Sequence, residues 1–186
     1  MARSGAWLQC ADGAGQDEEG QQPGQLGPAF GHLAVGVPDV ALVPGPDRAP
    51  QWPDGVVGSI SHTAGFCLAA AGPAQRYFAI GVDVEKRGAV GPHLETYVAT
   101  EHEARTFGAV DDWRTVAFSV KESVFKALNP RTGIWLEFHD VVLTTLDEPR
   151  FEVDVRPKGR APFGLVGGYA LTDDFVVSAV VLTVAP

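Results

Sequence analysis

Two acidic side chains, Asp83 and Glu85, are separated by one residue in the segment Gly81-Val-Asp-Val-Glu85. If this segment is a β-strand, alternation places both carboxylates on one face and the valines on the other. The carboxylates then lie roughly 7 Å apart, and their repulsion is about 2 kcal/mol at an effective dielectric constant of about 20. A divalent cation reverses the sign of that interaction, and all-oxygen ligation suits Mg²⁺. Taken alone, the pair is more typical of a solvated strand edge.

A second cluster lies in the segment Phe118-Ser-Val-Lys-Glu-Ser-Val-Phe-Lys126. Glu122 and Lys126 are four residues apart, so a helix places them on one face. One interpretation is a surface ion pair worth a few tenths of a kcal/mol. However, Lys121 and Lys126 flank Glu122 in an otherwise apolar stretch. A carboxylate between two ammonium groups can bind a metal while the lysines neutralise a phosphate.

A third cluster, Ser61-His62, lies near the end of an alternating segment. Adjacent residues of a strand point to opposite faces, so this is not an obvious nucleophile–base pair. A hydroxyl, a backbone N–H and an imidazole are instead good donors to phosphate, although His62 can equally be a structural histidine. Arg48 is the first cation after a stretch without Lys or Arg, and Trp52, between prolines, offers a rigid surface for a nucleotide. A Trp that covers the core from a loop is the alternative.

Secondary-structure signals place these clusters on strands and helices. A helix is expected over 99–107, with Thr100 as N-cap and Glu103 completing a capping box. A longer helix is expected from Asp111 or Asp112 through Leu128, ended by Asn129-Pro130. Strands are expected over 56–63, 66–71, 78–85, 140–146, 151–156, 163–171 and 175–184. The first three are joined by short turns, which favours an antiparallel meander. The order of strands, helices and strands predicts an α+β fold.

Bulk properties narrow the class of protein. The chain has 186 residues and a net charge of −9, which argues against a nucleic-acid binder. No apolar run approaches the roughly 20 residues of a membrane span, and the first ten residues lack a signal-peptide pattern. We therefore expect a cytoplasmic protein without membrane contact. Residues 1–37 form an atypical segment that we expect to be partly disordered, followed by an N-terminal half over 38–95 and a C-terminal half over 96–186 of one compact unit.

Together and in this order, the stretches 48–62, 80–85 and 118–126 resemble the phosphopantetheinyl transferases of the Sfp/EntD type. The resemblance extends over about residues 38–184. It implies the fold of that family, in which two similar halves are related by a pseudo-twofold axis and each has a small antiparallel sheet and a helix. It also implies a monomer that transfers the 4′-phosphopantetheine arm of coenzyme A (CoA) to a serine hydroxyl of an acyl or peptidyl carrier protein, releasing 3′,5′-ADP. Secondary metabolism, including siderophore biosynthesis, is the implied setting.

The resemblance also implies roles for individual residues. Asp83, Glu85 and Glu122 match the ligands of Mg²⁺, with Mn²⁺ as an alternative. Glu122 also matches the general base, and Lys126 the residue that holds the diphosphate. Contacts with CoA as co-substrate match Arg48, Ser61, His62, Lys121 and Lys126.

Two aspects of the sequence leave other functions open. Members of the family usually begin with an Arg-rich helical region that grips the 3′-phosphate, whereas this chain has no Lys or Arg between Ser4 and Asp47. We therefore expect weaker CoA binding, and a non-catalytic CoA-binding paralogue is one alternative. A Mg²⁺-dependent phosphohydrolase with the same three carboxylates is another. For an acidic carrier protein, a local basic rim is expected, with candidates Arg105, Arg114 and Arg131.

Overall fold

The computed structural model describes residues 7–9, 42 and 49–185 of the chain. Arg48 and most of the atypical segment predicted over residues 1–37 lie outside these residues. Within the described part, the α+β class is confirmed, with two antiparallel sheets and few helices. The pseudo-twofold relationship and the boundary between the halves stay predictions.

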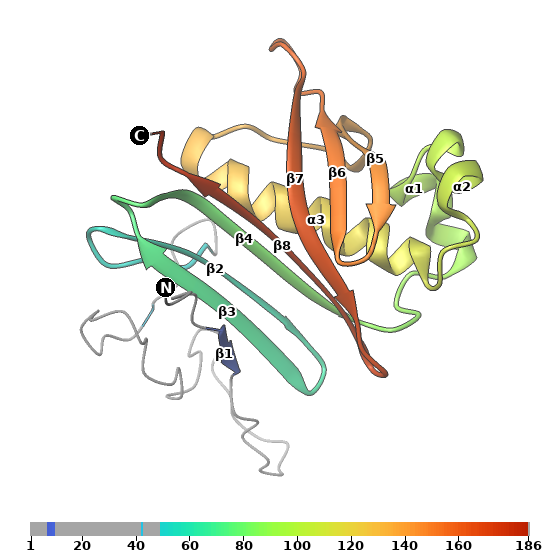
Figure 1. The fold of residues 1–186 in the computed structure, drawn as a ribbon, viewed down its shortest axis with the longest axis horizontal. Coiled ribbons are helices and arrows are strands. Elements are labelled where there is room, and N and C mark those ends of the chain that lie inside the picture. The colour runs from blue at the N-terminus through green and yellow to red at the C-terminus, as the bar shows by residue number, and fades with distance from the viewer. Residues whose placement is uncertain (1–6, 10–41, 43–48, 186) are drawn as a thin grey trace, which may run out of the picture.

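The smaller sheet has three strands in the order β1-β3-β2. Its strands are β1 (Trp7–Gln9), β2 (Val56–Thr63) and β3 (Phe66–Pro73). The larger sheet has the order β4-β8-β7-β6-β5 and crosses the middle of the molecule (Figure 1). Its strands are β4 (Tyr77–Lys86), β5 (Val141–Asp147), β6 (Arg150–Val155), β7 (Phe163–Leu171) and β8 (Phe175–Thr183).

The expected meander of the first three strands is wrong at its third member. β2 and β3 form an antiparallel hairpin, but β4 pairs with β8, which is distant in sequence. β4 is buried continuously from Ala79 to Val84, because α3 packs on one of its faces and the β2–β3 hairpin packs on the other. A short turn predicts that two strands are near each other, but here the hairpin lies across a face of β4, and the edge of β4 is paired with β8.

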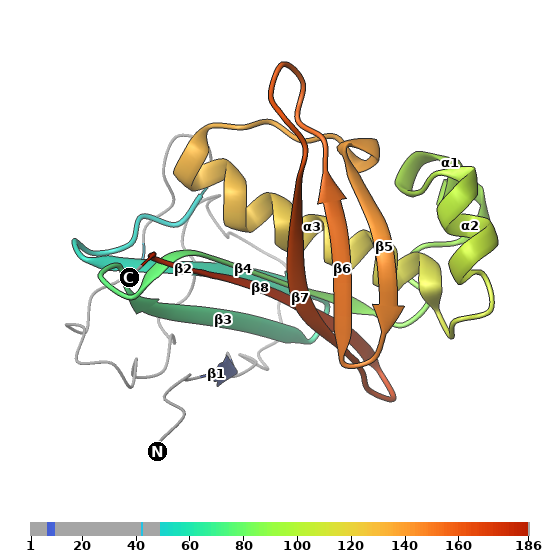
Figure 2. The ribbon, with the colours of Figure 1, turned by 45° about the horizontal axis from the view of Figure 1, so that its top comes forward.

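Helices account for the stretch between β4 and β5. They are η1 (Pro92–Leu94), α1 (Glu95–Val98), α2 (Glu101–Phe107), α3 (Trp113–Thr132) and η2 (Phe138–Asp140). The capping box of Thr100 and Glu103 is confirmed at the start of α2. α3 packs its apolar stripe, including Val116, Val120 and Val124, against the larger sheet (Figure 2).

The predicted end of α3 at Asn129-Pro130 is wrong, because the helix continues to Thr132. A proline lacks only its own N–H, so the residues that follow it can still bond backwards in the last turn. Thr132 Oγ1 donates to the carbonyl of Leu128, and the N–H of Gly133 donates to the carbonyl of Asn129. Gly133 has φ of 67° and ends the helix in the left-handed region.

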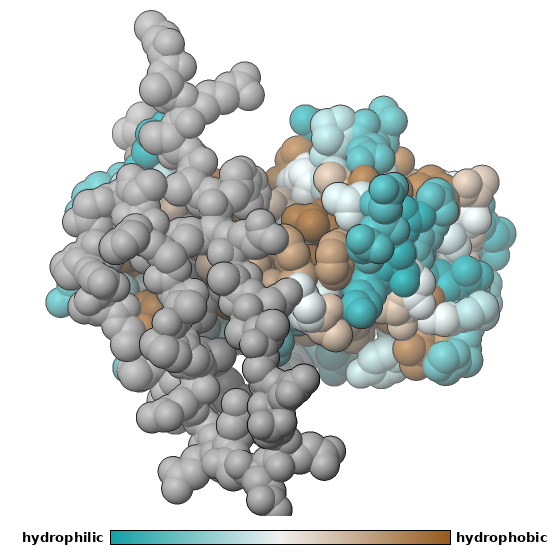
Figure 3. Space-filling model, turned by 90° about the horizontal axis from the view of Figure 1, so that it is seen from below, coloured by the Kyte–Doolittle hydropathy of each residue, from teal (hydrophilic) through white to brown (hydrophobic). Residues whose placement is uncertain are grey.

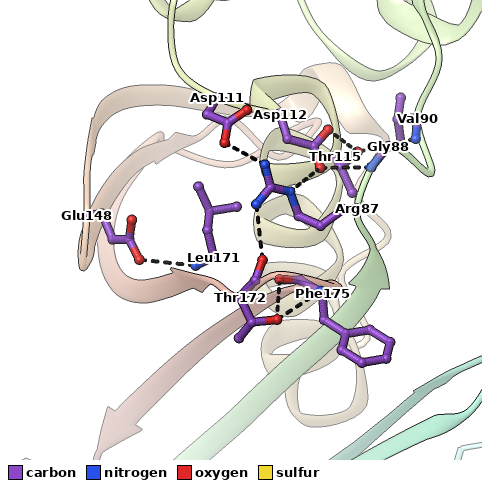
Figure 4. A network of polar contacts seen from close by, with 10 residues as sticks. All are labelled: Arg87, Gly88, Val90, Asp111, Asp112, Thr115, Glu148, Leu171, Thr172 and Phe175. Carbon is purple, nitrogen blue, oxygen red and sulfur yellow. Dashed lines mark hydrogen bonds and ion pairs between the residues drawn. The ribbon is translucent and has the colours of Figure 1, made fainter.

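Arg87, directly after β4, connects three elements (Figure 4). Its guanidinium forms ion pairs with Asp111 and Asp112 before α3 and donates to the carbonyl of Thr172 in the β7–β8 hairpin. Asp112 also accepts from the N–H of Gly88 at 2.9 Å. The end of β4 is thereby fixed to the start of α3, the helix that carries the second predicted cluster.

The lower face of the molecule shows apolar side chains grouped beside hydrophilic ones (Figure 3). None of the helices in the described part of the chain is long and apolar enough to cross a membrane.

Candidate active site

The backbones of α3 and β4 approach each other closely at Gly81. A Cβ added to Gly81 would lie 1.9 Å from the carbonyl oxygen of Ser123 and 2.6 Å from the backbone nitrogen of Ala127. Any other residue at position 81 would push the helix away from the strand. The glycine therefore allows the carboxylates of β4 and the charged residues of α3 to share one site.

Asp83 is the centre of this site. Its side chain is 1% exposed, and Oδ1 accepts from Lys126 Nζ at 2.6 Å and from Ser61 Oγ at 2.8 Å. Lys126 Nζ also donates to Ser61 Oγ at 3.0 Å, which closes a triangle of three side chains. The sequence prediction that places Asp83, Ser61 and Lys126 in one site is therefore matched by a direct contact between them.

β2 and β4 are joined by side chains where a sheet ladder would otherwise run. The hydroxyl of Ser61 accepts from the N–H of Val84 at 3.3 Å, and that of Ser59 accepts from the N–H of Val82 at 3.1 Å. These hydroxyls satisfy buried amides on the free edge of β4. The two sheets thus meet at the candidate site without forming one continuous sheet.

Glu85 and Glu122 are partly buried close to Asp83. Burial, followed by the neighbouring charge of Asp83, raises the pKa of Glu85 to about 7, and Glu122 adds to the effect. Burial is also the main cause that raises the pKa of Glu122, with Asp83 contributing further. Lys126 lowers the pKa of both carboxyl groups. The three carboxylates predicted as metal ligands therefore influence one another electrostatically, as members of one site.

The residues present fit a divalent cation. In the described part of the chain, no three His, Cys, Asp or Glu side chains already converge as a metal cluster. However, Asp83 Oδ2 is buried and has no hydrogen-bond partner, which is costly for a carboxylate oxygen. Two neighbouring carboxyl groups have raised pKa values, and a cation would offset both penalties. An oxygen-only donor set of this kind suits Mg²⁺.

Lys121 lies apart from this triangle. Its side chain is buried, and Nζ lies 2.8 Å from Glu103 Oε1 and donates to the carbonyl of Val98 at 2.9 Å. Glu103 also accepts from the N–H groups of Thr100 and Leu143. Although burial opposes its charged form, these partners, Lys121 foremost, hold the pKa of Glu103 below its usual value. The ammonium of Lys121 is therefore engaged inside the protein, and its predicted contact with CoA stays a prediction.

The remaining predicted CoA contacts are placed differently. Ser61 is buried, and its hydroxyl is used by Asp83, Val84 and Lys126. His62 is exposed and, by the alternation of β2, points away from Ser61. Arg48 lies outside the described residues.

Two cavities lie beside the site, and each is lined by one of its α3 residues. The first, of about 630 Å³, lies beside Glu122 and is lined by Tyr97, Phe125, Trp135, Leu136, Phe138 and Val141 among others. The second, of about 600 Å³, lies between β2 and the C-terminal half of α3 and includes Lys126. Phe125 and Trp135 line both, with ring centroids 5.2 Å apart in an edge-to-face arrangement. Glu122 and Lys126 thus face different cavities from one helix.

Some residues that build the site were missed by sequence reasoning. Ser178 is the cross-strand partner of Asp83, and its hydroxyl lies 2.9 Å from that of Ser119 on α3. Ser178 Oγ also donates to the carbonyl of Ser119. These serines carry no local signal of their role, because the partner of each is far away in the sequence. Glu103 did carry a signal as a cap, but its second role as the partner of Lys121 was not visible.

Comparisons with known proteins agree with this arrangement. The sequence model of the 4′-phosphopantetheinyl transferase superfamily matches residues 79–180, which include all three carboxylates and both lysines. A second model, of the 4′-phosphopantetheinyl transferase N-terminal domain, matches residues 31–72.

Two similar curated proteins carry the same description, and a third is described as a component of enterobactin synthase. The chain is 34% identical over 164 residues to 4′-phosphopantetheinyl transferase Svp of Streptomyces mobaraensis, covering 82% of this chain and 66% of that protein. It is 32% identical over 114 residues to 4′-phosphopantetheinyl transferase PptT of Mycobacterium tuberculosis, covering 59% of this chain and 50% of that protein. It is 34% identical over 128 residues to enterobactin synthase component D of Salmonella typhi, covering 63% and 52%. The alignments thus span between half and just under two thirds of the length of these relatives.

Proposed function

We propose, from the premise that this chain belongs to the 4′-phosphopantetheinyl transferase superfamily, that it transfers the 4′-phosphopantetheine arm of CoA to a serine hydroxyl of a carrier protein. The observation that carries the proposal is the triangle of Asp83, Ser61 and Lys126 beside two further carboxylates, with Glu122 lining one cavity and Lys126 lining a second. Because the relatives include an enterobactin synthase component, a carrier of a siderophore pathway is a reasonable first substrate to test.

The cavities suit the two ends of CoA. The second cavity has two cations and two tryptophans, which favours the nucleotide end. The first cavity is lined mainly by apolar and aromatic side chains, which favours the uncharged pantetheine arm. The diphosphate would then lie between them, next to Lys126. The carrier serine must approach from the side of Glu122.

The reaction requires charge neutralisation and in-line geometry more than covalent chemistry by the protein. The serine oxygen bonds to the β-phosphorus as the bond from that phosphorus to the bridging oxygen breaks, and 3′,5′-ADP leaves with the bonding electrons. Glu122, which lines the first cavity, accepts the serine proton, directly or through water. Lys126 offsets the charge that develops on the leaving diphosphate oxygen.

Asp83, Glu85 and Glu122 would hold Mg²⁺, with the unpartnered Oδ2 of Asp83 as one ligand atom. When bound, the ion would neutralise charge on phosphate oxygens that Lys126 alone cannot. Lys126 already occupies Asp83 Oδ1, so it also fixes the orientation of the carboxylate.

The decisive experiment is to incubate the protein with CoA, Mg²⁺ and an apo carrier protein and to measure the mass of the carrier. A gain equal to one phosphopantetheine group supports the transferase. Cleavage of CoA without a change in the carrier indicates a phosphohydrolase, and CoA binding without either indicates a non-catalytic paralogue. Both of the latter outcomes contradict the proposal.

A matched pair of variants assigns the base. Glu122→Gln keeps the size of the side chain but removes its basicity, so transfer should be lost. Glu152→Gln changes an exposed carboxylate on β6, which pairs with Arg150, and should leave transfer unchanged. If Glu122→Gln retains a near-normal rate, the base is another group.

A further inference from the structure

The second cavity presents positive charge although the chain as a whole is acidic. The sequence has 23 acidic and 14 basic residues, yet no Asp or Glu is among the described residues that line this cavity. Its charged lining residues are Lys126 and Arg131, both on α3. A cavity whose described lining has two cations and no carboxylate attracts an anion even though the protein as a whole repels one.

Aromatic rings give the same cavity a second property. Trp52 packs so closely on β2 that a Cβ added to Gly58 would lie 2.6 Å from its ring. Trp135 contributes an exposed ring that contacts Phe125 edge to face. Flat rings beside cations form a suitable surface for a nucleobase attached to phosphate groups. The cavity therefore matches a nucleotide better than a simple inorganic anion.

Arg131 is the cation whose role is unassigned. It lies five residues after Lys126, which corresponds to about 7.5 Å along a helix axis. Its guanidinium lies over the ring of Phe78, 5.3 Å from the centroid. Among the described residues it forms no ion pair, whereas Arg105 and Arg114, the other two candidates for a carrier-binding rim, pair with Glu101 and Glu95. Its position in the cavity argues for a ligand contact instead of a rim.

We infer that Arg131 binds the ribose 3′-phosphate of CoA and thereby selects CoA over its 3′-dephospho form. This inference rests on the proposed function, in which Lys126 holds the diphosphate. The 5′-diphosphate and the 3′-phosphate leave one ribose ring in different directions, and two cations spaced along α3 can contact one each. A guanidinium can hold a phosphate through two parallel hydrogen bonds. Because residues 4–47 contain no Lys or Arg, this cation from α3 supplies charge that the N-terminal segment lacks.

A binding experiment tests the inference without relying on catalysis. Affinities for adenosine 3′,5′-bisphosphate and for adenosine 5′-monophosphate are measured by calorimetry, because the two ligands differ only in the 3′-phosphate. The wild-type protein should prefer the bisphosphate by about 10-fold or more, as expected for a hydrogen bond between charged groups. Arg131→Gln should remove most of this preference, and Arg131→Lys should restore part of it.

Arg76 provides a matched control. Its guanidinium lies over Tyr77, 5.5 Å from the ring centroid, in a contact like that of Arg131 with Phe78. It does not line the second cavity, so Arg76→Gln should leave the preference intact. The inference is overturned if the wild-type protein shows no preference, if Arg131→Gln keeps it, or if Arg131→Gln weakens both ligands equally while its melting temperature is unchanged.

Transfer assays with CoA and 3′-dephospho-CoA separate this inference from the proposed function. The expected result is that Arg131→Gln raises KM for CoA, with little change in kcat and little change for the dephospho form. A wild-type enzyme that modifies the carrier, combined with an Arg131→Gln variant that discriminates normally, contradicts the inference alone. If Arg131→Gln loses the binding preference but the wild-type protein does not modify the carrier, the result contradicts the proposed function alone.

Discussion

Lys126 Nζ lies 2.6 Å from Asp83 Oδ1, while the other oxygen of the same buried carboxylate, Oδ2, has no hydrogen-bond partner in the described structure. One oxygen is therefore used to fix the orientation of the carboxylate, and the other remains available to a ligand. The unpartnered Oδ2 is the main reason to expect a metal at Asp83, since a purely structural ion pair would leave no carboxylate oxygen without a hydrogen bond.

Asp83→Asn tests whether Asp83 binds a metal in addition to its contact with Lys126. The amide oxygen can still accept from Lys126, so the protein should fold, but the charge needed for Mg²⁺ is removed. We expect transfer to fall by about 100-fold or more and Mg²⁺ to stop raising the melting temperature. Asp154→Asn, at an exposed carboxylate that pairs with Arg156, serves as control and should change neither measurement. A near-normal rate for Asp83→Asn would exclude Asp83 as a ligand.

Ser61 and Ser59 allow stability and positioning to be separated. Both hydroxyls are buried and accept from an amide of β4, but only Ser61 contacts Asp83 and Lys126. Ser61→Ala and Ser59→Ala should each lower the free energy of unfolding by about 1–3 kcal/mol, because each leaves a buried amide unsatisfied. Urea denaturation measures this loss.

The difference between the two variants should appear in activity. Ser61→Ala releases one constraint on Asp83, so its kcat and the pH dependence of its kcat should change more than those of Ser59→Ala. Equal effects on kcat at equal loss of stability would show that Ser61 has a structural role only.

The parts of the fold that depend on local patterns could be predicted from the sequence. The stripe of Val116, Val120 and Val124 predicted α3, and Thr100 with Glu103 predicted the start of α2, since both signals lie within a few residues. The pairing of β4 with β8 could not be predicted in this way, because the two strands are far apart in the sequence and no local pattern links them.

The same limit applies to the site. The types and spacing of Asp83, Glu85 and Glu122 indicated a shared acidic site, and the structure places Asp83 close enough to raise the pKa of both glutamates. The partner of Lys121 could not be foreseen, because Glu103 belongs to another helix and had a complete local explanation as a cap. The spacing of residues in the sequence indicated which side chains could share a site, but the packing of the core determines which of them are in contact.

Stability in the absence of metal should depend on pH through Glu85. Burial and Asp83 raise its pKa from 4.5 to about 7 in the folded protein, so the folded state holds this proton over a range where the unfolded state has lost it. The free energy of unfolding should therefore decrease as the pH rises from about 4.5 to about 7. Glu122, whose pKa is also raised, contributes in the same direction.

Urea denaturation in the presence of a chelator, at several values between pH 5 and about 8, measures this dependence. Glu85→Gln should flatten the curve, and added Mg²⁺ should restore stability mainly at the upper end, where the carboxylates are ionised. A metal-free protein whose stability increases steadily over this range would contradict the assignment.

In the buried pair of Glu103 and Lys121, the effect of each charge on the free energy of unfolding should depend on the presence of the other. Glu103→Gln leaves the ammonium of Lys121 buried without its counter-charge, and Lys121→Met leaves the carboxylate of Glu103 in the same position. Each single change should lower the free energy of unfolding by about 3–5 kcal/mol. The double variant removes both charges and should cost clearly less than the sum of the two, which a double-mutant cycle by urea denaturation would show.

The double variant also decides between the two roles assigned to Lys121. If the ammonium serves only to hold α3 against α2, the double variant should regain stability and show a normal KM for CoA. If it also contacts a phosphate of CoA, as the resemblance implies, KM should stay raised after stability has returned. Because Val98 and Glu103 already occupy this ammonium, we expect the first result. A KM that remains about 10-fold higher in the stable double variant, as the loss of a charged hydrogen bond would produce, would show that Lys121 leaves this pair when CoA binds.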